Sequence, residues 1–583
     1  MTAPHDDAPD HLHAPDHLHA PGDSYAPEHA PAPRHTPAPD QSYTPHRTPA
    51  PEHAPARRHT PAPDRTPGFR PAAAPRRGRD RRARIVAPRP GRPRITGDPP
   101  RAAVIGGGIA GLAAATALAE RGVRVTLYER EQQLGGRLAG RPVTLSDGTT
   151  ATMSRGFHAF FRQYYNLRGL LRRADPGLDR LRALPDYPLW HSGGLRDSFA
   201  RVPRTPPWNA LAFAALSPSF RAADLAGMNP RAALPLFDVR VPDVYRRLDD
   251  VSAAELLERI RFPEAAHHLA FEVFSRSFFV PPRTLSAAEL ALMFHIYFLG
   301  SSEGLLFDVP DEPFPQALWE PLGDYLAGHG AQLLEGRPVD VVEPGRNSGF
   351  TVDAAGRTDH HDAVVLALDT AGLRRVVAQS PRLGDRAWRT RIRRLRTAPP
   401  FLVSRYWLDR PVDRHRPGFL ATSGYDGLDN VSVLERWEGE AARWAARTGG
   451  SVVELHAYAT APGIHRPIFQ EGMLTRLRSL YPEIRDALVV DERHEWRADC
   501  PHFPVGGYQD RPTVRTPDPA VVVAGDLVRT DLPVALMERA ATSGFLAANA
   551  LLEQWGVRGQ TLWTVPTRGR SAPLRALARL AAG

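Results

Sequence analysis

Four residues near position 100 have the types and spacing of a dinucleotide-binding site. Gly106, Gly108 and Gly111 form the pattern G-x-G-x-x-G, and Glu129 follows Gly106 by 23 residues. Glycines at these positions let the backbone approach a pyrophosphate at the beginning of a helix, where unpaired N–H groups favour an anion. The carboxylate would accept hydrogen bonds from ribose hydroxyl groups. The spacing therefore predicts that the chain binds a dinucleotide.

A second glycine turn indicates which dinucleotide this is. Gly135 and Gly136 are followed by Arg137. A turn and a cation beside the first motif would let a longer cofactor extend past the pyrophosphate. The sequence has no second G-x-G-x-x-G that could hold a nicotinamide cofactor. These features favour FAD over NAD. The spacing of the histidines fits no defined metal site, and we expect no metal.

A second candidate site lies in the segment SRGFHAFFRQYYNLR, residues 154–168. His158 is a candidate base, because the intrinsic pKa of an imidazole suits proton transfer at neutral pH. Arg155 stays charged, so we expect it to steady a cofactor or to orient His158 rather than to take a proton. The aromatic side chains that could line an apolar cavity are Phe157, Phe160, Phe161, Tyr164 and Tyr165. Phe157, Phe161 and Tyr164 also have helix-like spacing, so they could instead belong to a core.

A parallel sheet would position these residues. Residues 102–105 have the pattern of a buried strand, an alanine-rich helix follows the glycines, and residues 123–128 form a second strand before Glu129. The apolar run 363–368 and a strand before Gly525 and Asp526 would return to the same domain. The predicted fold is α/β: a Rossmann-like FAD-binding domain with an inserted α+β substrate lobe, preceded by a disordered N-terminal tail.

The predicted boundaries divide the chain into seven parts. Residues 1–98 form a Pro/His/Arg-rich tail with internal repeats, whose composition cannot form a core. The FAD-binding domain comprises residues 99–158, the return segment 329–394 and the C-terminal part 506–560. The substrate lobe comprises the helical, aromatic-rich residues 159–328 and residues 395–505. Residues 561–583 form a C-terminal tail.

Composition limits the classes of protein to consider. The chain has 583 residues and a net charge of +10, and all 74 basic residues are arginine. Cys500 is the only cysteine, which excludes a disulfide within the chain. Neither a transmembrane helix nor a signal peptide is predicted, so we expect a cytoplasmic protein. The arginine-rich run 70–94 could be a solvated tail or could bind an anionic membrane or nucleic acid. No nucleic-acid recognition fold accompanies it, and we expect no nucleic acid as partner.

The C-terminal segment AVVVAGDLVRTDLPVALMERAATSGFLAANALLEQW resembles the FAD-dependent amine oxidase and carotenoid desaturase superfamily. With RGFHAFFRQYYN, EAAHHLAFEVFSRSFF and FLGSSEGLLFDVPDEPFPQALWEPL, the chain is similar to the isorenieratene synthases, a β-carotene desaturase/methyltransferase family. This resemblance covers about residues 101–555. It implies that Asp526 holds the ribityl chain of FAD, that the preceding Gly525 also belongs to the cofactor site, that backbone near Met537 meets the isoalloxazine ring, and that Val339 contacts the adenine.

The resemblance also implies a reaction. Each β-ionone ring of β-carotene would become aromatic by hydride transfer to the flavin, a 1,2-methyl shift and proton loss, with no methyl donor. The terminal electron acceptor could be a quinone or oxygen. An insoluble substrate favours a peripheral position on a membrane surface. The apolar segment 271–300 could be a membrane patch or a buried helical pair, and the segment WNALAFAALSPSF from Trp208 is a second candidate patch.

Three alternatives stay open. Another carotenoid desaturase or isomerase could act on an acyclic polyene with the same FAD motifs. A flavin amine oxidase is less expected, since many of these enzymes place a lysine near the flavin and this chain has none. A non-catalytic flavin- or lipid-binding module is the alternative from another class of protein.

Overall fold

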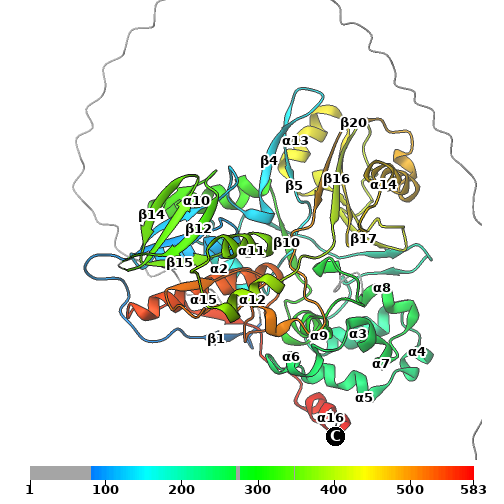
Figure 1. Ribbon diagram of the computed structural model, residues 1–583. Coiled ribbons are helices and arrows are strands. Elements are labelled where there is room, and N and C mark those ends of the chain that lie inside the picture. The colour runs from blue at the N-terminus through cyan, green and yellow to red at the C-terminus, as the bar shows by residue number, and fades with distance from the viewer. Residues whose placement is uncertain (1–79, 271–275, 347, 583) are drawn as a thin grey trace, which may run out of the picture. The chain divides into compact units, whose positions relative to one another are not determined.

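The computed structural model describes residues 80–270, 276–346 and 348–582 (Figure 1). Most of the predicted tail, residues 1–79, lies outside this range, as do residues 271–275 of the first candidate membrane patch.

The two ends of the described chain pair with each other. Strand β1 (Arg84–Val86) is antiparallel to β22 (Leu562–Thr564), and buried Asp80 forms a 2.6 Å ion pair with Arg570. Helix α16 (Ala572–Ala582) packs against the helical lobe. The predicted tail boundaries at 98 and 561 are therefore wrong. Each terminal strand finds its partner at the far end of the chain, which local composition could not reveal.

A five-stranded parallel sheet collects three distant parts of the sequence. Its strands, in spatial order, are β11 (Gln332–Leu334), β3 (Arg124–Tyr128), β2 (Arg101–Ile105), β15 (Ala363–Leu366) and β21 (Val521–Val523). The strands predicted at 102–105, 123–128 and 363–368, and the strand before Gly525, are confirmed. Parallel strands end at one edge of a sheet, so the residues that follow β2, β3, β15 and β21 meet there.

Both faces of this sheet are covered, which explains the continuous apolar sequence of its strands. Ala102 and Val104 face the core that contains α1 (Ile109–Ala119) and α15 (Leu536–Gln554). Helix α15 approaches α1 closely, because Gly544 has no Cβ that would overlap the Ala110 carbonyl. The opposite face packs against the antiparallel strands β12 (Val339–Pro344), β13 (Phe350–Ala354) and β14 (Arg357–His361).

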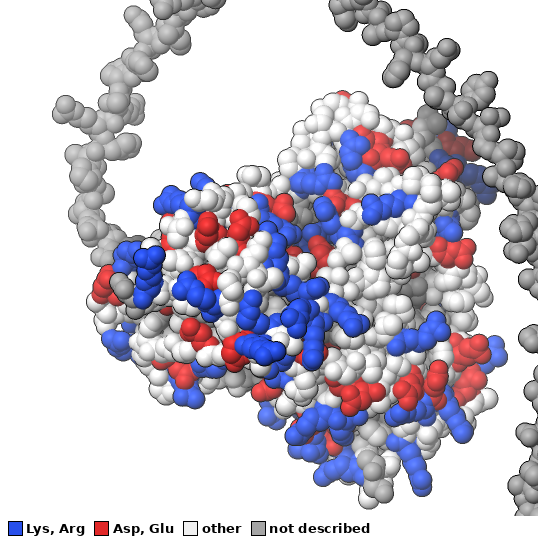
Figure 2. Space-filling view, in the orientation of Figure 1, with Lys and Arg blue, Asp and Glu red and all other residues white. Residues whose placement is uncertain are grey.

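Two helices complete that second face, α11 (Thr370–Gln379) and α12 (Arg386–Arg394). Helix α12 buries Trp388 and Ile392, which are four residues apart and lie on one side of the helix. Its arginines gather on the outer surface, as Figure 2 shows. This part of the face is therefore charged and solvated.

A second sheet has seven strands and lies apart from the parallel sheet, with β16, β17 and β20 at the upper right of Figure 1. Its strands, in spatial order, are β20 (Val489–Arg497), β16 (Phe401–Leu408), β19 (Ser451–Ala457), β18 (Asn430–Val433), β17 (Phe419–Ser423), β8 (Leu189–His191) and β9 (Arg196–Asp197). Helix α14 (Arg466–Leu480) covers one face of this sheet through Met473 and Leu477. Helix α13 (Gly439–Thr448) packs its Ala441 and Trp444 into a core on the other side.

Short helices form the remaining lobe, between residues 208 and 300. They are α3 (Trp208–Leu216), α4 (Ala222–Gly227), α5 (Pro230–Ala233), α6 (Asp243–Leu248), α7 (Ala253–Ile260), α8 (His267–Ala270), α9 (Ala287–Phe294) and the π-helix His295–Gly300. Residues 287–293 and 295–300 are buried. For this part of the segment 271–300, the buried interpretation is right and the membrane patch is wrong. The carboxylate of Glu289 on α9 joins the lobe to the domain of the parallel sheet, through ion pairs with Arg539 on α15 and with Arg511, which precedes β21.

Candidate active site

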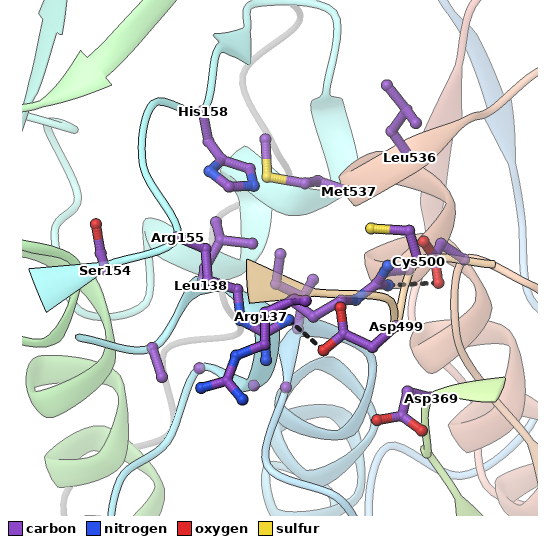
Figure 3. A pocket seen from close by; sticks show the side chains of 18 of the residues that line it. Arg137, Leu138, Ser154, Arg155, His158, Asp369, Asp499, Cys500, Leu536 and Met537 are labelled. Carbon is purple, nitrogen blue, oxygen red and sulfur yellow. Dashed lines mark hydrogen bonds and ion pairs between the residues drawn. The ribbon is translucent and has the colours of Figure 1, made fainter. Parts of the chain in front are cut away.

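A cavity of about 690 Å³ joins the predicted dinucleotide site to the aromatic segment. Every predicted site residue except Gly111 lines it: Gly106, Gly108, Glu129, Gly136, Arg137, Arg155, His158, Val339, Gly525, Asp526 and Met537. Figure 3 shows Arg137, Arg155 and His158 around the same space as Met537 at the beginning of α15. Gly111 instead serves packing, since a Cβ at this position would overlap the carbonyl oxygen of Gly106.

The nucleotide end of the cavity begins at the first glycine turn. Gly106 has φ +109°, a conformation that side chains rarely adopt, and a Cβ there would overlap the Ala367 carbonyl. Helix α1 begins after Gly108 with no side-chain cap and no acidic residue in its first turn. Ile109 and Ala110 of that turn line the cavity, so the unpaired N–H groups of the helix face it. This backbone surface fits the diphosphate of FAD.

Glu129 closes the turn from the end of β3. One carboxylate oxygen accepts the Gly107 N–H at 2.7 Å, and the other accepts the Glu131 N–H at 2.9 Å. Burial raises the pKa of this carboxyl group. Its remaining acceptor capacity faces the cavity, where it could bind ribose hydroxyl groups.

The second glycine turn lies against the first. Gly108 and Gly135 form a parallel bridge, and a Cβ on Gly136 would lie 3.1 Å from the Gly108 Cα. Arg137 follows and forms a 2.6 Å ion pair with Asp526. Although burial opposes the charged form, this carboxylate raises the pKa of Arg137. The structure thus brings together two residues predicted from opposite ends of the sequence.

Two further predicted contacts frame the same end. Val339, at the beginning of β12, is 4% exposed and lines the cavity beside Glu129. Helix α15 begins after Ala535 with no side-chain cap, and Leu536 and Met537 of its first turn line the cavity. Gly525 donates its N–H to Ser543 on α15 at 2.9 Å, which fixes this helix to the end of β21.

The far end of the cavity is aromatic. Phe157 stacks on Phe419 with ring centroids 4.1 Å apart, and Phe161 meets Tyr297 edge to face at 4.6 Å. Phe160 and Phe161 form the short strand β6, and α2 (Tyr165–Leu171) begins later, so the helix-like spacing of the aromatic residues is misleading. Phe157, Phe161 and Tyr164 line the cavity, as predicted. Phe160 and Tyr165 are buried in the cores.

His158 is half-buried and lines the cavity. Its Nδ1 lies 2.9 Å from the Gly156 carbonyl oxygen, which identifies Nδ1 as the protonated nitrogen of the neutral ring. Burial lowers the pKa of His158 to about 4, and the charge of Arg137 acts in the same direction. The imidazole is therefore neutral at physiological pH, with its Nε2 lone pair able to accept a proton.

Arg155 has a different contact from the one predicted. Its guanidinium forms a 2.5 Å ion pair with Asp499 (Figure 3). The backbone carbonyl of Gly156, not Arg155, orients His158. Arg155 nevertheless lines the cavity, so a contact with a bound cofactor stays a prediction.

A polar group in the cavity wall is not among the residues predicted from the sequence. Glu454 and His456 on β19, and Tyr458 just beyond it, form a continuous hydrogen-bonded row. His456 and Tyr458 line the cavity. In the strand sequence SVVELHAYA these residues alternate with apolar ones, and that alternation in an otherwise buried strand is the signal that could have identified them.

Known proteins are similar to this chain over the part of the sequence that forms the cavity. The family model of flavin-containing amine oxidoreductases matches residues 109–552. A carotenoid phi-ring synthase of Streptomyces griseus is 71% identical over 506 residues, which cover 87% of this chain and 98% of that protein. A protein of the same name from Chlorobaculum tepidum is 28% identical over 593 residues, covering 81% and 91%. The solved structure of putrescine oxidase bound to putrescine has the same fold, with a TM-score of 0.59 at 18% identity, covering 78% of this chain and 99% of that one.

Proposed function

Because this chain belongs to the flavin-containing amine oxidoreductase family and is therefore an FAD-dependent oxidoreductase, we propose that it converts the β-ionone rings of β-carotene into aromatic rings, with migration of one methyl group. The carotenoid phi-ring synthases among its relatives support an FAD-dependent enzyme that modifies carotenoid rings. One structural observation carries the finer proposal: a single cavity joins an FAD cradle to an aromatic, apolar chamber that contains His158.

Different residues at the nucleotide end of the cavity would bind different parts of FAD. We expect the first turn of α1 to bind the diphosphate, Glu129 the ribose, and Val339 the adenine. Asp526, held by Arg137, would contact the ribityl chain, and the first turn of α15 with Met537 would meet the isoalloxazine. FAD, when bound there, supplies a two-electron acceptor for hydrogen removed as hydride from a substrate carbon.

Ring aromatisation makes demands that the far end of the cavity meets. A β-ionone ring has one double bond and an arene has three, so each ring loses four hydrogens. Removal of a hydride leaves positive charge in the ring, and the carbon that bears two methyl groups then passes one methyl to its electron-deficient neighbour, which relocates that charge. Phe157, Phe161 and Phe419 line this space. Each favourable contact of a cation with an aromatic face contributes about 0.5–2 kcal/mol.

His158 is our candidate base for loss of a ring proton. Its Nδ1–H donates to the Gly156 carbonyl, which leaves Nε2 to accept a proton. Loss of that proton would make the cationic substrate ring neutral. A pKa of about 4 describes a weak base, but a carbocation is a far stronger acid than any side chain. The low pKa therefore keeps the imidazole neutral without making proton transfer unfavourable.

Substrate delivery would use an exposed apolar surface on the helical lobe. Trp208, Leu211 and Leu216 of α3 are 63%, 47% and 59% exposed, and Leu225 of α4 is 37% exposed. Exposed apolar side chains of this size suit insertion into the apolar layer of a membrane. In the part of the chain that the structure describes, no helix has both the length and the apolarity to span a bilayer. We propose that the enzyme binds the membrane surface peripherally and passes electrons to a quinone or to oxygen.

Pigment analysis tests the proposed function. The full chain would be produced in a bacterial host that accumulates β-carotene, and its carotenoids would be separated by chromatography and weighed by mass spectrometry. We expect each ring to lose four hydrogens with no change in the number of carbons. If FAD is bound but β-carotene stays unchanged, the proposal is wrong, and acyclic carotenoids become the substrates to test.

A further inference from the structure

Three side chains along β19 form a hydrogen-bonded row that ends in the cavity. Glu454 and His456 are two residues apart on β19, so they lie on one face of the strand, and Tyr458 follows directly after its end. The His456 Nε2 lies 2.9 Å from a Glu454 carboxylate oxygen, and its Nδ1 lies 2.7 Å from the Tyr458 hydroxyl. Glu454 and His456 are 0% and 2% exposed, whereas Tyr458 is half-buried and lines the cavity with His456.

Neighbouring strands support each member of the row. Arg405 on β16 is paired in register with Glu454 and bonds its second carboxylate oxygen at 2.8 and 3.1 Å. Asn430 on β18 is paired in register with His456, and its side-chain amide donates to the Tyr458 hydroxyl at 2.7 Å. The row is therefore built into the sheet rather than formed by mobile surface groups.

The donors and acceptors in the row have one consistent direction. Burial alone would raise the pKa of Glu454, but Arg405 and His456 lower it to about 2, so this carboxylate only accepts. The His456 Nε2–H must then donate to it, which leaves Nδ1 of the neutral ring as an acceptor. The hydroxyl of Tyr458 accepts from Asn430 and donates its own proton to that Nδ1. These two bonds leave one lone pair of the hydroxyl oxygen unused, on a residue that lines the cavity.

The row also holds the segment that carries the candidate base. The Phe157 N–H donates to the Glu454 oxygen that accepts from His456, at 2.9 Å. Gly156 has φ +83°, and a Cβ there would lie 2.6 Å from this oxygen and would overlap His456. His158, which is oriented by the Gly156 carbonyl, is thus fixed relative to the row.

We propose that Tyr458 is a catalytic proton acceptor for the ring chemistry and that His456 and Glu454 form its relay. The inference rests on the proposed function, because a substrate C–H bond must be broken as a proton. The C–H electron pair becomes a ring double bond and cancels the positive charge. The proton binds to the Tyr458 oxygen as the hydroxyl proton of this residue passes to Nδ1 of His456. Glu454 then compensates the imidazolium at 2.9 Å.

Each substrate ring loses two protons, so a second proton acceptor besides His158 has a role. Four hydrogens leave each ring as two hydrides and two protons, so two proton-transfer steps are required. His158 and Tyr458 both line the cavity, and the Gly156–His158 segment connects them. Burial also raises the pKa of Tyr458 well above its usual range. A free phenolate is therefore disfavoured, and Tyr458 must lose its own proton to His456 as it accepts another.

The experiment compares purified, FAD-loaded Tyr458→Phe with the parent enzyme, using β-carotene in liposomes. Tyr458→Phe removes the hydroxyl but keeps the ring, whose edge-to-face contact with Phe279 has a centroid distance of 4.9 Å. We expect kcat to fall by about 10²–10⁴-fold, the usual range for a positioned acid or base. KM should change little, because an apolar substrate gains no hydrogen bond from the hydroxyl. The matched control is Tyr406→Phe, which removes a hydroxyl on the face of the same sheet that packs against α14.

A second variant separates proton transfer from positioning. In His456→Gln, the amide can still accept from Tyr458 and donate to Glu454, but it cannot take up a proton. We expect His456→Gln to be as slow as Tyr458→Phe, and the double variant to be no slower than either, because the residues act as a unit. FAD content and melting temperature of each variant show whether the fold is intact.

The outcomes distinguish this inference from the proposed function. If the parent enzyme aromatises rings and Tyr458→Phe, or folded His456→Gln, keeps its kcat within about twofold, the relay is overturned and the proposed function stands. If the parent leaves β-carotene unchanged, the proposed function is wrong. The same variants are then compared on an acyclic carotenoid that the parent dehydrogenates, where a loss of about 10²-fold supports the relay and parental rates overturn it.

Discussion

Replacement of His158 by Gln gives the most direct test of the candidate base. The Gln amide can donate to the Gly156 carbonyl, as Nδ1 does at 2.9 Å, but it cannot accept a proton under working conditions. We expect kcat for ring aromatisation to fall by about 10²–10⁴-fold with little change in KM. His329→Gln is the control, since His329 is exposed and bonds the Tyr325 carbonyl on the nucleotide side of the molecule.

The pH dependence follows from the lowered pKa of His158. The base must be neutral, and its pKa falls from the ordinary 6.5 to about 4. Activity that depends on His158 should therefore persist as pH falls through 6.5 and decline only near pH 4. The unfolded chain binds a proton at this residue near pH 6.5, whereas the folded chain does so only near 4. The stability contribution is thus complete above pH 6.5 and is lost as pH falls toward 4.

The size of this effect can be worked out. A shift from 6.5 to about 4 corresponds to about 3 kcal/mol, at about 1.4 kcal/mol per pKa unit. Between pH 6.5 and 4 the parent should lose about 3 kcal/mol more unfolding free energy than His158→Gln, because other buried groups, such as His295, titrate alike in both proteins. Denaturant titrations of both proteins at pH 7 and pH 4 measure the difference. An acid limb of kcat with its midpoint near 6.5, or identical pH dependence of stability in the two proteins, would refute the reasoning.

Three further predictions concern the rest of the site. Asp526→Asn leaves the Arg137 guanidinium without its 2.6 Å partner in the cavity, so we expect the ratio of FAD to protein, measured by absorbance, to fall several-fold; parental FAD content would contradict the assignment. Gly156→Ala forces φ +83° on a residue with a Cβ, which costs about 1–2 kcal/mol of stability, and the added Cβ overlaps Glu454 and His456. We expect a lower melting temperature and product formation reduced more than 10-fold. An unchanged melting temperature and rate would refute this close packing. Trp208→Ser with Leu216→Ser should weaken sedimentation with liposomes at unchanged FAD content, and unchanged binding would exclude α3 as the membrane contact.

The nucleotide end of the site was predictable because local rules determine it. Gly106, Gly108 and Glu129 lie within one strand–helix–strand unit, and each has a backbone reason for its identity that does not depend on distant residues. Asp526 and Met537 required a resemblance to a known family, since no local pattern relates them to that unit. The structure then placed Asp526 against Arg137, a pairing that neither segment indicates alone.

The residues that were missed depend on contacts between distant strands. Tyr458 and His456 face the cavity only because β19 lies between β16 and β18, a pairing set by the tertiary fold. The composition of residues 80–98 continues that of the preceding repeats and therefore indicates a tail. Ile85 of β1 is 51% exposed, so no buried pattern marked the strand, and its stability depends on β22 at the other end of the sequence.

The two ends of the cavity differ in charge, and each end suits a different part of the proposed reaction. At the nucleotide end, Glu129, Arg137 and Asp526 provide charges and hydrogen bonds that suit a polar, anionic cofactor. At the aromatic end, the candidate proton acceptors are neutral: His158 because burial lowers its pKa, and Tyr458 because burial opposes the phenolate. A ring cation formed there would meet aromatic side chains and these neutral bases. Methyl migration, which needs the cation to survive before its proton is lost, is the step that such an environment would protect.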